Sequence, residues 1–264
     1  MLKSENLTYK YEDGTLAIDN VSVDFSKGNV IGVIGANGAG KTTLFKCLLG
    51  ILKPSSGSII FNGSSLSYKK KALNELRKSV TMIMQDPEKQ IFHSNIYDDV
   101  AFGPRNLGKS EEEVEEIVTR NLMSVKMWDL REKPVHYISY GQKKRVAIAG
   151  AMALSPDLIL MDEPTSGLDP RMETDMKNII GRLKEDNKRV IISSHDMDLI
   201  YEICDYIYLI KDGKILKHGD KKEVFVDEAS IISAGLKLPW LVKLHTKLGM
   251  GLFSNESELF ASKG

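Results

Sequence analysis

The sequence predicts an α/β fold in which a parallel β-sheet presents a ligand site at the carboxyl ends of its strands. Short apolar runs rich in β-branched residues have the length and composition of buried parallel strands. A glycine-rich loop joins one such run to a helix, and polar residues directly follow the others. Ligands of open parallel sheets bind where the strands end, so these residues are the candidates for a binding site. The runs are residues 29–34, 80–84, 158–163 and 189–193.

Composition excludes some classes of function. The chain has 264 residues, with 36 Lys and Arg against 36 Asp and Glu, so no basic excess favours a nucleic acid as partner. Its two cysteines, Cys47 and Cys204, lack C-x-x-C spacing and indicate reduced thiols rather than a disulfide or a metal site. No signal pattern or bilayer-length apolar run occurs, so we expect any membrane role to be peripheral, at the cytoplasmic face and through another chain.

At the N-terminus, residues 2–9 and 21–25 are predicted strands around a tight turn at residues 12–14, which gives an antiparallel β entry. Tyr9 and Tyr11 alternate beside this turn. Each is either an edge-strand residue or an aromatic residue that stacks on a purine ring. Tyr11 lies nearer the turn and is the candidate for stacking.

The glycine loop, residues 35–42, matches the phosphate-binding pattern G-x-x-x-x-G-K-[ST] and precedes a helix predicted over residues 43–49. Backbone N–H groups and the helix dipole suit a triphosphate at this position. Lys41 is expected to reach the β- and γ-phosphates and Thr42 to ligate Mg²⁺. The alternative is a glycine-rich turn that binds nothing. The residues assigned to this cradle are Gly35, Asn37, Gly38, Ala39, Gly40, Lys41, Thr42 and Thr43.

The middle of the chain is less regular. The lysine run at residues 68–71 is predicted to be a solvated turn. Gln85 follows the predicted strand 80–84 and either reaches Mg²⁺ and an attacking water or is an ordinary loop residue. Residues 88–105 mix aromatic and charged side chains with no clean period, which fits a variable surface subdomain or a docking site. Residues 110–125 are predicted to form a helix capped by Ser110.

Two further groups of polar residues stand at element ends. Ser139, Gly141 and Gln142 precede a helix predicted over residues 143–154, where a serine is either an anion ligand or a structural N-cap. Asp162 and Glu163 end the run 158–163, and alternation along a strand predicts that they point different ways. Asp162 would then hold hydrated Mg²⁺, while Glu163 would orient and deprotonate the water that attacks the γ-phosphate.

The last predicted parallel strand, residues 189–193, is followed by His195, for which a role at the γ-phosphate competes with a structural one. Strands at residues 205–210 and 214–218 are predicted to close the domain as a hairpin. Short helices are predicted after it. The first covers residues 229–234, and the second begins at Pro239 and ends at residue 248. The third follows Asn255, which is expected to form a capping box with Glu258.

This ordered set of motifs resembles the ATP-binding cassette (ABC) family over about residues 1–220. The resemblance implies a RecA-like P-loop parallel sheet with an antiparallel β subdomain and a helical subdomain near residues 86–156. It also implies two cassettes that close head to tail over two ATP molecules. The resemblance implies that residues 35–42 form the Walker A loop and that Tyr11 stacks on adenine. It implies that Gln85 belongs to the Q-loop, Asp162 to Walker B and Asp169 to the D-loop, with Glu163 as the catalytic base and His195 as the switch residue. Ser139 and Gly141, next to Gln142, would bind the γ-phosphate of the ATP held by the partner's Walker A loop.

Ile138 and Tyr140 depart from the common signature L-S-G-G-Q, whereas Gly141 is retained. With Gln-Asp-Pro-Glu-Lys-Gln-Ile-Phe at residues 85–92 and the run at 141–150, this pattern is similar to energy-coupling-factor (ECF) importers, especially their cobalt and nickel ATPases. That likeness implies substrate-binding membrane subunits and a transmembrane scaffold docked on residues 90–102. Phe92, Ile96 and Tyr97 would be its anchors, and the alternative is that these side chains fill the core of the helical subdomain. It also implies a C-terminal extension, residues 221–264, that helps to hold the ATPase dimer.

We therefore expect ATP hydrolysis that drives import of a micronutrient, either a transition-metal ion such as cobalt or nickel or a vitamin. Mg²⁺ would be the cofactor. The partner would be a second ATPase subunit, either identical or related. A soluble cassette acting on DNA or ribosomes would instead predict a second cassette, a long coiled-coil insertion or a basic surface, and the sequence contains none of these. A P-loop kinase would transfer phosphate to a small acceptor rather than to water.

Overall fold

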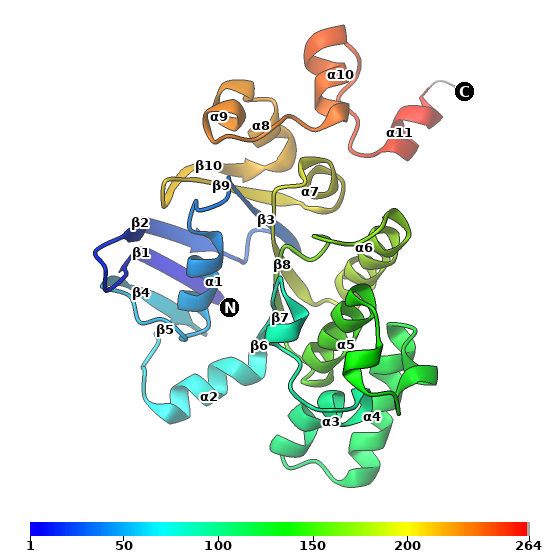
Figure 1. Ribbon diagram of the computed structural model, residues 1–264. Helices are drawn as coiled ribbons and strands as arrows, with labels where there is room; N and C mark the ends of the chain where they lie inside the picture. The colour runs from blue at the N-terminus through cyan, green and yellow to red at the C-terminus, as the bar shows by residue number, and fades with distance from the viewer. Residues whose placement is uncertain (263–264) are drawn as a thin grey trace. The chain divides into compact units, whose positions relative to one another are not determined.

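The computed structural model describes residues 1–262, which divide into two compact units (Figure 1). Unit 1 comprises Met1–Leu73 and the chain from Ile191 onward, and unit 2 comprises Asn74–Val190. This division does not follow the boundaries expected from the sequence at residues 86, 156 and 220.

The antiparallel β entry predicted from the sequence is confirmed in unit 1. β1 (Leu2–Lys10) pairs antiparallel with β2 (Leu16–Asp24) and β4 (Ser56–Phe61), and the short β5 (Ser64–Ser65) completes the order β2-β1-β4-β5. The chain reverses between β1 and β2 at the predicted turn, where Tyr11 N–H donates to Thr15 O at 2.9 Å.

In unit 1, the glycine loop follows a buried strand. β3 (Val30–Ile34) is buried along its whole length and pairs parallel with β9 (Tyr206–Lys211). β10 (Lys214–Asp220) pairs antiparallel with β9, which confirms the predicted closing hairpin. β8 (Arg189–Ser194) enters unit 1 at Ile191 and neighbours β3 on its other side. The helices that follow β3 and β8 are α1 (Lys41–Leu48) and α7 (Met197–Ile203).

Unit 2 combines a two-stranded parallel ladder with a group of helices. β6 (Val80–Ile83) pairs parallel with β7 (Leu158–Asp162). The helices α3 (Ile96–Asn106), α4 (Glu111–Ser124) and α5 (Tyr140–Ala153) pack on one another through buried aliphatic side chains such as Val100, Val118 and Ile148. The other elements of this unit are α6 (Pro170–Glu185) and the 3₁₀ helices η1 (Pro87–Lys89), η2 (Trp128–Leu130) and η3 (Val135–Tyr137).

Some elements of the middle segment differ from the prediction. The solvated turn predicted at residues 68–71 is wrong, because α2 (Lys70–Ser79) begins inside it. The lysines of this run lie at the surface, whereas Leu76 is fully buried, so the segment is an amphipathic helix. In the stretch without a clean period, Asn95 caps α3 by accepting from Asp98 N–H at 2.8 Å.

The C-terminal tail belongs to unit 1 and consists of α8 (Lys221–Phe225), α9 (Glu228–Ser233), α10 (Trp240–Leu248) and α11 (Glu256–Ala261). Tyr201 Oη donates to Phe253 O at 3.0 Å, which ties the tail to α7. Within residues 1–262, no helix combines the length and the apolar character that crossing a bilayer requires.

Two details of the tail correct the prediction. Pro239 is the N-cap of α10 rather than its first helical residue. Asn255 caps α11 by accepting from Glu258 N–H at 2.8 Å, but the Glu258 carboxylate accepts from Ser254 N–H, so the expected capping box is only half formed.

Candidate functional site

The glycine loop of unit 1 has the backbone that a phosphate cradle requires. Gly38 and Gly40 have φ of 81° and 103°, and a side chain at residue 40 would place Cβ only 2.5 Å from Ala17 O. Gly40 is the N-cap of α1 and has no side chain to cap it, so the positive end of the helix dipole lies at the loop. The loop therefore offers backbone donors and the positive end of a helix dipole to an anion.

Lys41 places a cation at this loop. Its side chain is only 7% exposed, and its Nζ donates to Gly35 O at 2.7 Å and to Ala36 O at 3.2 Å. The ammonium is thus held against the loop backbone, where a phosphate oxygen could exchange with these carbonyls. Thr42, the next residue, is exposed.

Tyr11, the candidate for adenine stacking, is joined to the same helix. Its Oη and Thr43 Oγ1 are 2.9 Å apart and share a hydrogen bond. The ring packs edge-on against Tyr9, with centroids 5.0 Å apart, and remains 37% exposed. A fixed and partly exposed aromatic ring beside a phosphate cradle has the properties that stacking on a purine needs.

His195 is exposed and directly follows β8 in unit 1. The next residue, Asp196, caps α7 by accepting from Leu199 N–H at 3.1 Å. The histidine therefore lies at a fixed point between a strand end and a helix start, as the sequence predicted.

In unit 2, the two adjacent acids lie at the carboxyl end of β7 but not in one strand. β7 ends at Asp162, and Glu163 has φ of 47°, in the left-handed region. The strand therefore ends one residue before the end of the run predicted over residues 158–163. Both side chains are nearly buried, at 3% and 6% exposure. A left-handed non-glycine residue costs about 1–3 kcal/mol and must be stabilised by its surroundings.

Lys144 on α5 supplies part of that stabilisation, and the sequence analysis did not identify it. Its Nζ donates to the backbone carbonyls of Glu163 at 3.1 Å, Pro164 at 3.0 Å and Ser166 at 2.6 Å. The side chain is 1% exposed. Burial lowers the pKa of Lys144 to about 8, while the charge of Glu163 acts in the opposite direction. Helical spacing could have indicated that Lys144 is buried, because it places Lys144 on the same face of α5 as Gly141, Ile148 and Ala151, which are buried.

Tyr140, at the start of α5, links this helix to the residue predicted to follow the strand at residues 80–84. Tyr140 Oη donates to the main-chain carbonyl of Gln85 at 3.1 Å. Burial, with Asp86 and Glu88 nearby, raises the pKa of Tyr140, so the phenol keeps its proton at neutral pH. The Gln85 side chain itself is exposed.

The start of α5 is a capping box. Ser139 Oγ accepts from Gln142 N–H at 3.3 Å, and Gln142 Oε1 accepts from Ser139 N–H at 2.9 Å. Gly141 is buried, and a Cβ there would lie 2.1 Å from Met172 Sδ. Asp169 similarly caps α6, accepting from Met172 N–H at 2.8 Å. Ser139 thus has a structural role, and its exposed hydroxyl also faces solvent at a helix N-terminus.

The predicted site residues divide between the two units. Unit 1 carries the glycine loop with Tyr11, Thr43 and His195, a set suited to binding a nucleotide. Unit 2 carries Gln85, Asp162, Glu163, Asp169 and the start of α5, a set suited to holding a metal ion and activating water. No group of three His, Cys, Asp or Glu residues within the described chain is arranged to hold a metal ion.

Of the expected docking anchors, only Phe92 is strongly exposed, at 63%. Ile96 is fully buried, so its assignment as a surface anchor is wrong, and Tyr97 is half-buried. Phe102, which is 40% exposed, packs edge-on against Phe92 with ring centroids 4.5 Å apart. The exposed aromatic pair of this segment is therefore Phe92 and Phe102.

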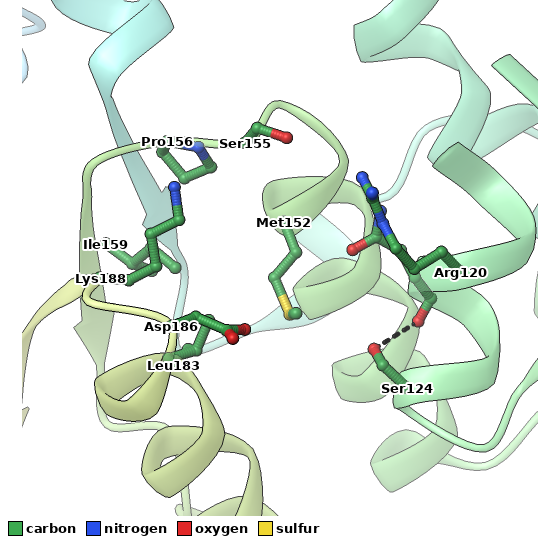
Figure 2. Close-up of a pocket in the computed structure, with 10 residues that line it drawn as sticks. Arg120, Ser124, Met152, Ser155, Pro156, Ile159, Leu183, Asp186 and Lys188 are labelled. Atoms are coloured by element: carbon green, nitrogen blue, oxygen red, sulfur yellow. Dashed lines mark hydrogen bonds between the residues drawn. The ribbon is translucent and has the colours of Figure 1, made fainter. Parts of the chain in front are cut away.

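Figure 2 shows a cavity of about 420 Å³ in unit 2 that none of the predicted site residues lines. It lies beside Ile159, near the start of β7, whereas Asp162 ends that strand. The cavity is lined by Arg120, Asn121, Ser124, Met152, Ser155, Pro156, Ile159, Leu183, Asp186 and Lys188.

Comparisons with known proteins extend over nearly the whole chain. The sequence profile of the family described as ABC transporter matches residues 18–166. The cobalt import ATP-binding protein CbiO of Salmonella paratyphi A is 46% identical over 260 residues, which cover 98% of this chain and 96% of that protein. The energy-coupling factor transporter ATP-binding protein EcfA of Methanococcus maripaludis is 43% identical over 244 residues, covering 92% and 88%.

Among solved structures, cbiO1 from Clostridium perfringens, described as part of the ABC transporter complex cbiONQ, has a similar fold. The TM-score is 0.78 at 39% identity, over 92% of this chain and 97% of that one.

Proposed function

The chain belongs to the ABC transporter family, as an ATP-hydrolysing transport ATPase, and from this premise we propose that it energises an ECF-type importer of a micronutrient. The observation that carries the proposal is the end-to-end match to a cobalt import ATP-binding protein, with 98% of this chain covered. Cobalt is therefore the first substrate to test, followed by nickel and the vitamins. The transported substrate would be selected by a membrane subunit.

In the proposed reaction, the N–H groups of residues 35–42 and the ammonium of Lys41 bind the β- and γ-phosphates of ATP. Tyr11 stacks on adenine. Glu163 accepts a proton from the water that attacks the γ-phosphorus, while Gln85 and His195 orient that water and the γ-phosphate. Asp169 caps α6 and so fixes the turn that follows Glu163.

Mg²⁺ is the metal ion that fits the donor set proposed for it. Thr42, Gln85 and Asp162 offer a hydroxyl, an amide and a carboxylate oxygen, the hard ligands that Mg²⁺ prefers beside phosphates. When bound, the ion would neutralise developing charge on the phosphate oxygens. Asp162 is the last residue of the fully buried β7 and is itself only 3% exposed, so its carboxylate lies at the carboxyl end of that strand.

The proposal includes a dimer with a second ATPase subunit, either identical or related. Ser139 and Gly141 would bind the γ-phosphate of the ATP held by the partner's glycine loop, with Gln142 supporting Ser139 through the capping box. The C-terminal extension, residues 221–264, would help to hold the dimer, and within its described part Ile232, Leu248 and Phe260 are exposed at 58%, 68% and 65%.

A transmembrane scaffold is the proposed membrane partner, which would keep the ATPase at the cytoplasmic face of the cell membrane. Its docking surface would be the exposed pair Phe92 and Phe102, which follows Gln85 closely in sequence. Aromatic anchors of this kind dominate many interfaces. Closure around ATP could then move the docking surface through the Q-loop.

Charged substitution tests this function. Phe92→Glu with Phe102→Glu should abolish copurification of membrane subunits while ATP hydrolysis by the isolated chain persists. Met123→Glu, at a 56% exposed position of α4 in the same unit, is the matched control. Mass spectrometry of the chains that copurify from native membranes identifies the partners. If ribosomal proteins or DNA copurify in place of membrane subunits, the chain is a soluble cassette and the proposal is wrong.

A further inference from the structure

Lys144 is an unusual side chain for the first turns of a helix, because it is almost completely buried and no carboxylate is hydrogen-bonded to it among the described residues. Its ammonium donates to three main-chain carbonyls instead, those of Glu163, Pro164 and Ser166. An ammonium has three N–H donors, so these contacts satisfy it completely. Within unit 2, one side chain of α5 thus contacts three carbonyls of the turn that follows β7.

The turn that Lys144 holds has a backbone that needs support. Glu163 is left-handed, with φ of 47°, although it precedes a proline, a position that favours extended backbone. The Glu163 carbonyl accepts from Ser166 N–H at 3.2 Å as well as from Lys144. Without Lys144, this carbonyl and that of Pro164 would lose their charged donor inside a buried region.

Tyr140 fixes the same turn from one helical turn earlier. Its ring lies beside Gly167, where a Cβ would come within 3.2 Å of Tyr140 Cε1, and Lys144 Nζ lies 5.6 Å from the ring centroid. The hydroxyl of Tyr140 reaches the Gln85 carbonyl. The first two turns of α5 therefore bind both the Q-loop backbone and the turn after β7.

We propose that Lys144 is a positioning residue for hydrolysis: through the carbonyls of residues 163, 164 and 166, it holds the Glu163 carboxylate in the direction that activates water. This inference rests on the proposed role of Glu163 as the base. Lys144 does not contact the nucleotide in this scheme, and the glycine loop is in the other unit. Its loss should therefore lower kcat and leave ATP affinity unchanged.

The test uses the full-length chain with Lys144→Met, which keeps an unbranched side chain one atom shorter but removes every donor. Lys143→Met is the matched control, because it removes a neighbouring ammonium that pairs with the exposed Glu88. We expect Lys144→Met to lower kcat about 10-fold or more, as a small misplacement of a catalytic group does, with the Kd for trinitrophenyl-ATP within about twofold of the parent. Lys143→Met should hydrolyse ATP at the parent rate.

Lys144→Gln is a second variant in case the methionine variant does not fold. It keeps two N–H donors, so we expect a kcat between those of the parent and Lys144→Met. In a Glu163→Gln background, Lys144→Met should cause no further loss of kcat, because both changes remove the same function.

Three results would overturn the inference. If Lys144→Met and Lys144→Gln have the kcat of the parent while Glu163→Gln is inactive, the positioning role of Lys144 is refuted and the proposed base is not. Equal losses of kcat, ATP affinity and thermal stability would make Lys144 a residue of the fold. Parent-like hydrolysis by Glu163→Gln would refute the proposed base and the inference with it.

Discussion

Two glycines of α5 provide a matched pair for testing the proposed signature site. At Gly150 a Cβ would meet no atom within 4 Å, whereas at Gly141 it would lie 2.1 Å from Met172 Sδ and 2.8 Å from Met172 Cε. Gly150→Ala should therefore gain the helix propensity of alanine, about 0.5–1 kcal/mol in the free energy of unfolding. Gly141→Ala must displace the Met172 side chain, and this overpacking should cost about 1 kcal/mol because methionine adapts easily.

The two variants should differ far more in activity. The added methyl group at residue 141 lies at the helix N-terminus proposed to face the partner's γ-phosphate, and an error of about 1 Å there should lower kcat by about 10²-fold. Gly150→Ala should hydrolyse ATP at the parent rate and melt about 1–4 °C higher. Steady-state hydrolysis and calorimetry of both variants provide the measurements. Parent-like kcat in Gly141→Ala would refute the role of this glycine, and a lower Tm in Gly150→Ala would refute the packing argument.

Two further predictions concern unit 1. The double variant Ile232→Asp with Leu248→Asp should lower the dimer fraction measured by sedimentation without nucleotide. The control Ile51→Asp, at a 56% exposed position of the same unit, should leave this fraction unchanged. Equal dimer fractions in the parent and the double variant would mean that the tail only covers its own unit. Lys217, 2.6 Å from Asp227, together with Ser230 lowers the pKa of Asp227 to about 2 from 3.8. Asp227→Asn keeps a good N-cap on α9 and should lose only the surface ion pair, about 0–1 kcal/mol, whereas Asp227→Ala should lose the cap as well, about 0.5–2 kcal/mol. Because the folded pKa is depressed, the stability difference between parent and Asp227→Asn should be complete above pH 4 and disappear as the pH falls toward 2 in urea titrations; a constant difference over this range would contradict the assignment.

The strands and the glycine loop could be predicted because their signals are local. Buried parallel strands are short β-branched runs, and turns such as Asn62-Gly63 and Asp212-Gly213 have both residues at positive φ in the structure. α2 was missed because the lysine run at residues 69–71, which overlaps its start, suggests solvent, although Leu76 of the same helix is buried. Ile96 was misassigned because aromatic and aliphatic residues near a loop do not indicate which of them turns inward.

The features around Glu163 could not be predicted from pattern alone. Hydrophobic alternation predicts which face of a strand is buried but not the dihedral angles at its end, so the left-handed backbone of Glu163 could not be predicted. Lys144 lies in the basic run Lys143, Lys144, Arg145, which looks like a solvated face. Only the tertiary contact with the turn at residues 163–166 distinguishes it from Lys143. The assignments of the catalytic and nucleotide-binding residues stay predictions until variants are measured.

The most direct test of the account is light scattering of Glu163→Gln in ATP and Mg²⁺, with hydrolysis followed in the same sample. Removing the base should lower kcat by about 10²-fold or more while nucleotide binding persists, so bound ATP should hold two chains together as a stable dimer. The parent should form this dimer only transiently, because it consumes the ATP. Glu163→Gln that hydrolyses ATP at the parent rate and stays monomeric with ATP would contradict the assignment of Glu163 as the base.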